Sequence, residues 1–537
     1  MTVQSWISST DRRFYPQSQP EKKLTCSGDF ALNERFSFQV MLRSDEEPLR
    51  CKLSAMVDEG WNVRIRRIGY VPVRHANTPY MDNPEDGDYG DGLPGYVPDA
   101  LFDEDNLLLP CNETHGFWIS VVPPENALAG EYKIQLQLET EGKTPMKLSY
   151  KARLHNVRLK LRENFNITHW FYGDSLVAYY KVKAFSEEFW QICRNYVEDY
   201  VAHGLDTLYV PAFTPPLDGV KLPTQLLRIE RKDKGYVFNW NNVKRWLKMA
   251  RECGIDNFEW VHPFTQWGCA YAIRIYEGEP EQEKLLFPTG TAACSEEYRA
   301  FLKQYFTELH ALLKREKLLD RSFFHVSDEP HSEPDKQNYI KARAMLKEIA
   351  PWMKTMDALT DIAYGRDKLT DMPVPSIRTA VSFVNEGIEC WCYYCCGPRG
   401  AFLNRLLDTP LPKVRMHGIL FYRWPFKGFL HWGYNYWFKS QTRILLDPYA
   451  EQDGLAWPGW AYGDTFMVYP GPDGKPVDSI RWEVFSEALQ DYQLLQTLNV
   501  SRDDAMFRKV KGFDDFPKQA SWRLKLRKKL FGCVDCE

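Results

Sequence analysis

Two adjacent carboxylic acids, Asp328 and Glu329, follow a short apolar run in the segment FFHVSDEPHSEPD, residues 323–335. Neighbouring carboxyl groups suit general acid–base chemistry, because one can donate a proton while the other stays ionised. The same residues also suit the start of a helix, since Ser or Asp can accept backbone N–H groups and Pro fits the first turn. The segment by itself therefore allows either a catalytic pair or a helix cap.

The elements around this pair bear on the choice. From about residue 164, short apolar runs alternate with amphipathic stretches, which is the pattern of parallel strands joined by helices. Eight runs are predicted as strands: residues 167–172, 205–210, 255–260, 322–327, 353–358, 377–382, 388–394 and 418–423. This count predicts a (β/α)8 TIM-like barrel, with an open sheet as the alternative. Asp328 and Glu329 directly follow the fourth strand, and active sites of such barrels lie at the C-terminal strand ends.

The first 160 residues have a different pattern. Apolar and polar residues alternate with a period of two, as at Phe36, Phe38 and Val40, and turn-rich stretches separate these runs. This predicts an all-β sandwich domain over residues 1–160. Residues 161–537 are predicted to form the (β/α)8 catalytic barrel, with a C-terminal extension in which a hairpin leads into a helix.

Composition limits the partners. The chain has 537 residues with 68 basic and 72 acidic side chains, so its net charge of −4 gives no reason to expect a nucleic-acid partner. No stretch is apolar over the roughly 20 residues that a membrane helix needs, and the N-terminal sequence lacks the pattern of a signal peptide. We therefore expect a cytoplasmic protein with no integral membrane segment.

Cysteine usage favours reduced thiols, because the 13 cysteines are scattered and odd in number. Two pairs have the spacing of a zinc half-site, Cys392 with Cys395 and Cys533 with Cys536. Neither has neighbouring His or Cys residues that clearly complete four ligands. The sequence therefore predicts no metal and no cofactor.

Aromatic residues lie at or near the ends of several predicted strands, among them Trp170, Trp260, Tyr393 and Trp424. Sugars have apolar C–H faces that stack on such rings, so these residues are candidates for carbohydrate contacts. With 18 Trp, 29 Tyr and 31 Phe in the chain, most rings must instead belong to cores and interfaces. His325 lies inside the fourth strand, where a hydrogen-bonded core position is expected.

Several segments resemble a known enzyme family. They are HVSDEP at 325–330, IECWCYYCCGPRGAFLNRLLD at 388–408, FLHWGYNYW at 429–437 and SIRWEVFSEALQDYQLL at 479–495. Together they resemble glycoside hydrolase family 123 and the wider domain of unknown function 4091. WNVRIRRIGYVPV and VPPENALAGEYKIQLQL are similar to that family's leading β-sandwich. The resemblance implies a retaining exo-β-N-acetylgalactosaminidase, in which the acetamido group of the substrate is the nucleophile beside an Asp-Glu pair.

The resemblance also implies separate roles for the two acids. Glu329 would protonate the glycosidic oxygen and later deprotonate water. Asp328 would stay ionised, hold the acetamido N–H and stabilise the positive oxazolinium. A tyrosine hydroxyl, from Tyr393 or Tyr394, would contact the acetamido oxygen. Together with the aromatic candidates above, the predicted substrate-binding residues are Trp170, Trp260, Tyr393, Tyr394, Trp424, Trp432, Asn435 and Trp437.

The expected partner is a carbohydrate or glycolipid with a terminal β-linked N-acetylgalactosamine (GalNAc). The alternative is a non-catalytic carbohydrate-binding protein on a degenerate glycosidase barrel, whose acids only cap the helix. The two hypotheses differ at Asp328 and Glu329, because catalysis requires both carboxyl groups to face one cavity.

Overall fold

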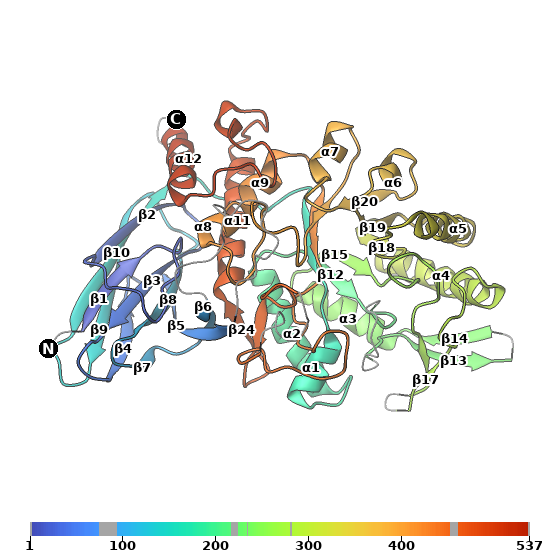
Figure 1. Ribbon diagram of the computed structural model, residues 1–537, viewed down its shortest axis with the longest axis horizontal. Helices are drawn as coiled ribbons and strands as arrows, with labels where there is room; N and C mark the ends of the chain where they lie inside the picture. The colour runs from blue at the N-terminus through green and yellow to red at the C-terminus, as the bar shows by residue number, and fades with distance from the viewer. Residues whose placement is uncertain are drawn as a thin grey trace.

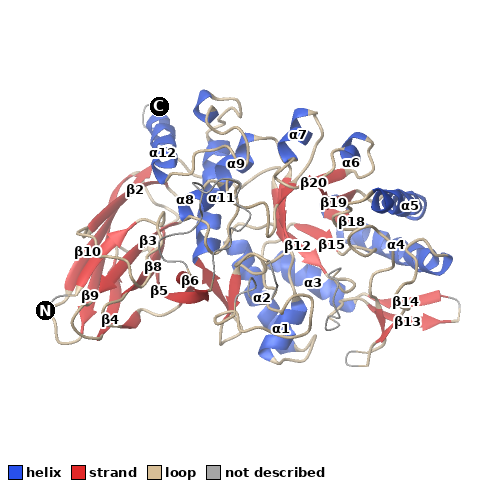
Figure 2. Cartoon of the chain, in the orientation of Figure 1, coloured by secondary structure: helices blue, strands red, loops and turns tan. Residues whose placement is uncertain are grey.

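Two β-sheets form the N-terminal part of the protein, on the left in Figures 1 and 2. The computed structural model describes residues 3–74, 94–215, 224–233, 235–279, 282–451 and 460–534. The strands of the two sheets are β1 (Gln4–Ser8), β2 (Thr25–Ala31), β3 (Phe36–Arg43), β4 (Leu49–Met56), β5 (Asn62–Val73), β6 (Gly95–Phe102), β7 (Asn106–Leu109), β8 (Thr114–Val122), β9 (Gly130–Thr140), β10 (Met146–His155), β23 (Val468–Pro470) and β24 (Pro476–Ser479). One sheet has the order β1-β3-β8-β5-β6-β24-β23 and the other β2-β10-β9-β4-β7.

One apolar cluster is shared by the two sheets. It contains Phe38 and Val40 of β3 together with Leu136 of β9 and Tyr150 of β10, and the rings of Phe38 and Tyr150 stack with centroids 4.4 Å apart. The predicted sheet-rich N-terminal part is confirmed. Strand pairing is antiparallel as expected, except that β2 pairs with β10 in parallel.

The predicted hairpin near the C-terminus extends the N-terminal sheet. β23 and β24 pair antiparallel, and β24 pairs with β6. The helix that follows, α11 (Ile480–Thr497), is tied to the same sheet by a buried ion pair between Arg481 and Asp99 with an N···O distance of 3.0 Å. Because segments from both ends of the chain share one sheet, the division into domains 1–160 and 161–537 stays a prediction.

Eight parallel strands form a nearly closed barrel in the second part of the chain. They are β11 (Asn166–His169), β12 (Thr207–Val210), β15 (Asn257–Trp260), β18 (Ser322–His325), β19 (Thr355–Leu359), β20 (Met372–Pro375), β21 (Cys392–Tyr393) and β22 (Gly428–His431). Their order is β20-β19-β18-β15-β12-β11-β22-β21. A parallel bridge between Ser376 and Tyr393 links the two ends of this order. This arrangement is consistent with the predicted TIM-like barrel.

The predicted strand at residues 377–382 is wrong. Part of this run belongs to helix α7 (Ala380–Asn385), and the sixth strand is β20, which lies just before it. β20 contains Pro373 and Pro375, and proline is unusual inside a strand because it lacks a backbone N–H. Because of these prolines, the sequence pattern does not indicate a strand here.

The predicted strand at residues 418–423 is also wrong. This run lies in helix α9 (His417–Arg423), and the eighth strand is β22. Residues 417 to 422 are all buried, so the helix lacks the polar positions that reveal an amphipathic helix in a sequence.

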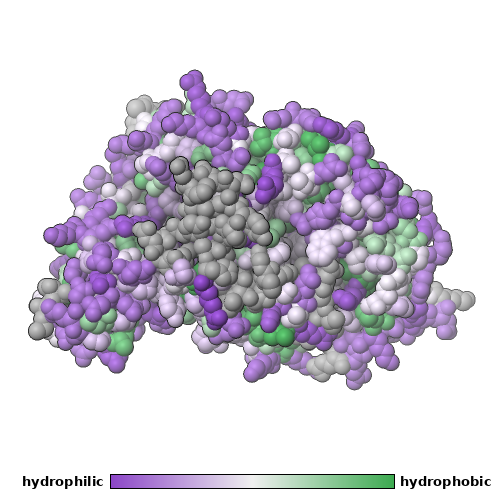
Figure 3. All heavy atoms as spheres, viewed as in Figure 1, coloured by the Kyte–Doolittle hydropathy of each residue, from purple (hydrophilic) through white to green (hydrophobic). Residues whose placement is uncertain are grey.

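Helices and short hairpins connect and surround the barrel strands (Figure 2). The other α-helices of the described residues are α1 (Gly173–Tyr180), α2 (Glu187–Ala202), α3 (Asn241–Glu252), α4 (Glu296–Glu316), α5 (Glu333–Ile349), α6 (Ala363–Arg366), α8 (Leu411–Val414) and α12 (Ala520–Val534). The hairpins pair β13 (Arg228–Lys232) with β14 (Gly235–Asn239) and β16 (Tyr276–Glu277) with β17 (Lys284–Leu285). Within the described ranges, no helix is long and apolar enough to cross a membrane. The described residues on the face shown in Figure 3 are predominantly hydrophilic, with hydrophobic residues in small groups.

The packing of α9 against α11 can be tested at one glycine. A Cβ atom on Gly418 would lie 1.8 Å from the backbone oxygen of Ala488. Gly418→Ala is therefore expected to lower the free energy of unfolding by about 3 kcal/mol, since backbone cannot move aside as a flexible side chain can. Gly532→Ala in α12 is the matched control, because nothing lies within 4 Å of its Cβ position. Urea unfolding should show the control to be neutral or slightly stabilised, and equal midpoints for the two variants would contradict the packing.

Candidate active site

A buried aspartate from β19 fixes the end of strand β18. Asp357 Oδ1 accepts the backbone N–H groups of Val326 at 2.9 Å and Ser327 at 3.0 Å, and its Oδ2 accepts the hydroxyl of Tyr339 in α5. These bonds set the direction in which the chain leaves the barrel just before the acid pair.

The acid pair does not cap the helix that follows. Ser332 is the N-cap of α5: its side chain accepts the N–H of Asp335, whose carboxylate accepts the N–H of Ser332, so the two form a capping box. Glu329 has a left-handed backbone, with φ +42°, and its N–H donates to the carbonyl of Ala358 at 3.0 Å. Such a conformation is uncommon outside Gly and Asn, and it is found at functional sites. Helix capping therefore does not account for the two acids.

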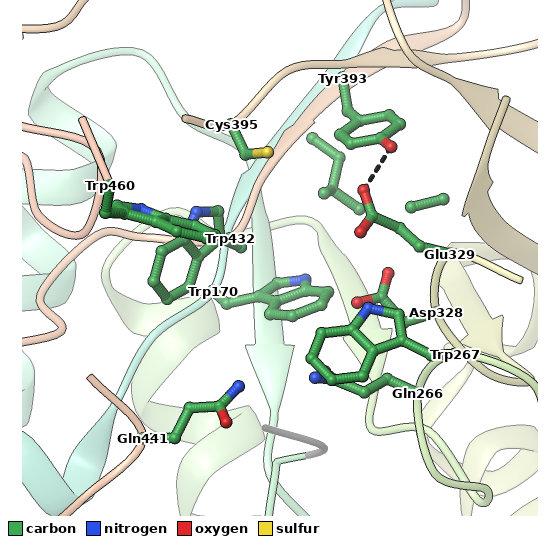
Figure 4. Close-up of a pocket in the computed structure, with 12 residues that line it drawn as sticks. Trp170, Gln266, Trp267, Asp328, Glu329, Tyr393, Cys395, Trp432, Gln441 and Trp460 are labelled. Atoms are coloured by element: carbon green, nitrogen blue, oxygen red, sulfur yellow. Dashed lines mark hydrogen bonds between the residues drawn. The ribbon is translucent and has the colours of Figure 1, made fainter. Parts of the chain in front are cut away.

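Both carboxyl groups line one cavity of about 250 Å³ at the C-terminal ends of the barrel strands (Figure 4). Its wall consists of Trp170, Gln266, Trp267, Asp328, Glu329, Ala358, Tyr393, Cys395, Leu430, Trp432, Gln441 and Trp460. Aromatic rings dominate this wall, with a few polar groups among them. A small apolar cavity with convergent polar groups is typical of a binding site for a small organic molecule.

The two acids have different surroundings. Glu329 Oε1 accepts a hydrogen bond from the hydroxyl of Tyr393 at 2.5 Å, drawn as a dashed line in Figure 4. Burial raises the pKa of Asp328 well above its usual range, and the neighbouring Glu329 carboxylate raises it further. Adjacent carboxylates oppose each other's ionisation, so such a pair is suited to divide the roles of proton donor and charged group between its members.

A buried charge network lies behind Trp170. Glu259 of β15 accepts the indole N–H of Trp170 at 2.7 Å and is hydrogen-bonded to the ring of His325. Burial lowers the pKa of His325, but the carboxylates of Glu259 and Asp357 outweigh this effect and raise it to about 9. His325 is thus buried and hydrogen-bonded, as predicted, and its positive charge opposes the rise in the pKa of Asp328.

A second buried carboxylate, Asp464, holds the tryptophan wall on the other side of the cavity. It accepts the indole N–H groups of Trp432 and Trp460, each at 2.8 Å, and it contacts the His431 ring at 3.2 Å. The two indoles are nearly perpendicular, with centroids 6.1 Å apart. Figure 4 shows these rings facing the acid pair across the cavity.

The structure brings part of the predicted site together. The predicted residues that line the cavity are Asp328, Glu329, Tyr393, Trp170 and Trp432. Tyr394 does not line it, and its hydroxyl is hydrogen-bonded to His417 Nε2 at 2.5 Å. Consecutive residues of a strand point to opposite faces, which separates the two tyrosines.

Two predicted tryptophans lie outside the cavity wall. The indole N–H of Trp260 donates to Ser322 Oγ at 3.1 Å, between neighbouring strands of the barrel. The indole N–H of Trp437 donates to the carbonyl of Val468 at 3.1 Å. Both rings are fully buried, and neither lines the cavity.

The two remaining candidates, Asn435 and Trp424, also lie outside the cavity wall. The side chain of Asn435 is bonded to both backbone groups of Tyr172, at 2.9 and 3.0 Å, so its polar atoms are used in joining two segments. Trp424 follows helix α9 rather than a strand, and its ring packs on Phe513 with centroids 5.4 Å apart. The expectation that Trp424 lies at a strand end depended on the predicted strand at residues 418–423, which is a helix.

Several cavity residues that the sequence did not predict come from loops. Gln266 and Trp267 lie in the long segment between β15 and α4, and Gln441 and Trp460 lie beyond β22. Loops have no periodicity that could indicate a side-chain direction. The one available signal was the pair Gln266-Trp267 a few residues after the third strand, where the loops of a barrel build its site.

Two groups of side chains could be considered as metal sites. Within the described ranges, three possible ligand atoms lie within 4.8 Å of one another in His262, His325 and Asp357, and again in Asp199, His203 and Asp478. In the first group the two imidazole rings stack 4.1 Å apart at 22°, so their nitrogens do not converge on one point. In the second group Asp478 already binds Arg64 at 3.1 Å and Arg66. Both groups are better described as hydrogen-bond and ion-pair networks.

The cysteine pairs have different positions. Cys392 is buried in β21, whereas Cys395 lines the cavity with the thiol of Cys396 at 3.8 Å. Cys533 is exposed, and Cys536 lies outside the described residues. The two members of the first pair thus face different surroundings.

The chain is similar to known glycoside hydrolases. A family model of the catalytic domain of glycoside hydrolase 123 matches residues 170–498. None of the curated proteins compared matches the chain. A solved family 123 glycoside hydrolase from Clostridium perfringens, described for its glycolipid glycan hydrolysis, matches with TM-score 0.76 and 13% identity over 100% of this chain and 98% of that one. A GH5 xyloglucanase from Bacteroides ovatus matches with TM-score 0.31 and 8% identity over 88% and 98%.

The Clostridium structure shows a shared fold over the whole chain, and the xyloglucanase score is too low to carry an argument. The family match is the stronger finding, because it covers seven of the eight barrel strands and the acid pair and supports glycoside hydrolase activity. The resemblance carried by the HVSDEP and SIRWEVFSEALQDYQLL segments is thereby confirmed. This chain belongs to glycoside hydrolase family 123.

Proposed function

We propose that this protein is a retaining, exo-acting glycoside hydrolase that removes terminal β-linked GalNAc by substrate-assisted catalysis. The observation that carries the proposal is that two adjacent acids, Asp328 and Glu329, line a single aromatic cavity of about 250 Å³. Binding sites for drug-sized ligands are larger, roughly 300–1,000 Å³. The cavity is therefore suited to one terminal sugar rather than to a long glycan chain.

In the first step, the carbonyl oxygen of the 2-acetamido group attacks the anomeric carbon while Glu329 donates its proton to the departing glycosidic oxygen. The bond to the leaving group breaks and an oxazolinium ion forms. In the second step, water attacks the same carbon, Glu329 takes a proton from it, and the acetamido group is restored. Two displacements at one carbon give net retention of configuration.

Asp328 is the proposed partner of the acetamido group. In the protein alone, burial and the Glu329 carboxylate hold the pKa of Asp328 well above its usual range. An acetamido N–H and a forming positive charge act in the opposite direction, because both favour the ionised carboxylate. Substrate binding would thus favour the ionised form of Asp328, while Glu329 is the proposed proton donor to the leaving group.

Tyr393 is the proposed hydroxyl that contacts the acetamido oxygen, because it faces the cavity beside Glu329. Trp170 and Trp432 are the proposed stacking faces for the sugar, and both are held by buried carboxylates. The expected substrate is a carbohydrate or glycolipid headgroup that ends in β-linked GalNAc.

The non-catalytic alternative would use the same aromatic residues, with the acids as a helix cap. Ser332 and Asp335 supply that cap instead. This observation favours the catalytic hypothesis over simple carbohydrate binding.

The test compares nitrophenyl β-glycosides of GalNAc, N-acetylglucosamine and galactose. We expect the highest kcat/KM for GalNAc and no turnover of the galactoside, which lacks the acetamido nucleophile. Proton NMR should show the β-anomer of GalNAc as the first product. A first product with α configuration, or comparable hydrolysis of the galactoside, would contradict substrate assistance. Binding of GalNAc without hydrolysis of any substrate would favour the non-catalytic alternative.

A further inference from the structure

One tryptophan of the cavity wall differs from the others in exposure. Trp267 is 46% exposed, whereas Trp170 is 2% and Trp432 is 9% exposed. Within the part of the chain that the structure describes, the ring of Trp267 contacts no other aromatic ring, and its indole N–H has no hydrogen-bond partner. An indole left this open at a cavity mouth is not explained by core packing.

The backbone around Trp267 holds the ring in place. Trp267 and Cys269 have left-handed φ angles of +59° and +52°, and Gly268 between them has φ +129°. The backbone N–H of Trp267 donates to the backbone carbonyl of Asp328 at 2.7 Å, so the tryptophan is attached directly to the acid pair. Residues in such conformations persist where the surroundings enforce them, and they cluster at functional sites.

The same loop is also attached to the start of α5. A Cβ atom on Gly268 would lie 2.3 Å from Asp335 Oδ1 of the capping box, so the loop and the helix are in close contact. The hydroxyl of Ser327 donates to the carbonyl of Thr265 at 2.7 Å. The loop is thus fixed to both sides of the acid pair, which makes Trp267 a rigid feature of the mouth.

A polar group beside Trp267 lacks a partner. Gln266 is only 6% exposed and lines the cavity, yet its Oε1 has no hydrogen-bond partner among the described residues. A buried amide oxygen without a partner is costly, so a ligand that donates a hydrogen bond would be favoured here. Sugar hydroxyls are such donors. An aromatic face next to an unpaired amide oxygen is therefore suited to a second sugar ring.

We propose that Gln266 and Trp267 form a second sugar-binding subsite at the cavity mouth, for the sugar on the leaving-group side of the cleaved bond. This inference rests on the proposed function. The terminal sugar occupies the depth of the cavity between Trp170 and Trp432, so the next sugar must lie where the cavity opens. Trp267 is an exposed residue of the cavity wall and lies beside Asp328 in Figure 4, and Glu329 must reach the oxygen between the two sugars.

The experiment uses the full chain with two substrates whose leaving groups are both alcohols, methyl β-GalNAc and a disaccharide with GalNAc β-linked to a hexose. A GalNAc-thiazoline, which fills only the terminal-sugar position, provides an inhibition constant. Trp267→Ala is expected to lower kcat/KM for the disaccharide about ten-fold, with changes of less than about two-fold for the methyl glycoside and the thiazoline. Trp267→Phe should keep most of the disaccharide activity, because it keeps an aromatic face.

Tyr271→Ala is the matched control, because Tyr271 is 49% exposed on the same loop but does not line the cavity. It should leave all three measurements unchanged. Gln266→Leu should also lower kcat/KM for the disaccharide more than for the methyl glycoside.

If Trp267→Ala weakens the turnover of both substrates and the binding of the thiazoline equally, the proposal is overturned, because Trp267 would then belong to the terminal-sugar position. Unchanged disaccharide activity would overturn it too. If the wild-type protein neither cleaves these substrates nor binds the thiazoline, it is the proposed function that fails.

Discussion

Replacing Glu329 with glutamine is expected to lower kcat/KM for substrates with a sugar leaving group by about 10³-fold, within the range that positioned acid–base groups contribute. Glutamine keeps the size of the side chain and an oxygen that can accept the hydrogen bond from Tyr393. It cannot deliver a proton to the departing oxygen or take one from water. The shape of the cavity should therefore survive while the proton transfers are lost.

The loss should depend on the leaving group. A nitrophenolate departs without a proton, so Glu329→Gln should impair the first step much less for a nitrophenyl glycoside than for a disaccharide. The second step still lacks its base. We therefore expect slow hydrolysis of the oxazoline to limit the variant on activated substrates, visible as a burst of nitrophenol in stopped-flow measurements.

The pH dependence gives a second readout with a definite sign. The Glu329 carboxylate is one cause of the raised pKa of Asp328, so its removal should lower that pKa. Because Asp328 must be ionised, the acid limb of kcat/KM should move to lower pH in Glu329→Gln. Glu333→Gln, an exposed position of the same segment, is the control and should keep the wild-type profile. Wild-type turnover of the disaccharide by Glu329→Gln would exclude Glu329 as the proton donor.

The barrel could be predicted where its strands have ordinary sequences. Strands such as β12 and β18 are short apolar runs bounded by helices with clear periodicity, and their positions follow from the burial of both sheet faces. β20 and α9 could not be predicted in this way. β20 contains two prolines, and α9 is buried all round, so each lacks the pattern on which prediction depends.

Most of the predicted site was found where a strand carried it, whereas Trp432 came from the resemblance of the segment at 429–437. Asp328 and Glu329 could be predicted because they lie just beyond the end of β18 at His325, and Tyr393 because it ends β21. Trp267 and Trp460 come from loops, where no periodicity gives the direction of a side chain. Asp464 was hidden for another reason: its role is visible only once Trp432 and Trp460 are seen to share it.

Replacing Asp328 with asparagine should lower kcat by about 10²–10³-fold, the cost of removing one electrostatic group from a transition state. Asparagine has the same shape but no charge, so it cannot balance the oxazolinium. The sugar itself would still be held by Trp170 and Trp432. KM should therefore change little, because an interaction made mainly in the transition state affects kcat and kcat/KM alike.

Inhibition by the GalNAc-thiazoline distinguishes the roles of the two acids, because its ring imitates the oxazolinium and carries no leaving group. Asp328→Asn should raise the inhibition constant by about 10²-fold, since the lost carboxylate would face that ring directly. Glu329→Gln should raise it far less, since the oxygen on which Glu329 acts is absent from the analogue. Equal inhibition constants for the wild type and Asp328→Asn would remove Asp328 from this role even if turnover had fallen, because the fall would then report a disturbed site. If the inhibition constant rises strongly in Asp328→Asn and little in Glu329→Gln, as expected, then Glu329 acts on the leaving group and Asp328 acts on the acetamido nucleophile.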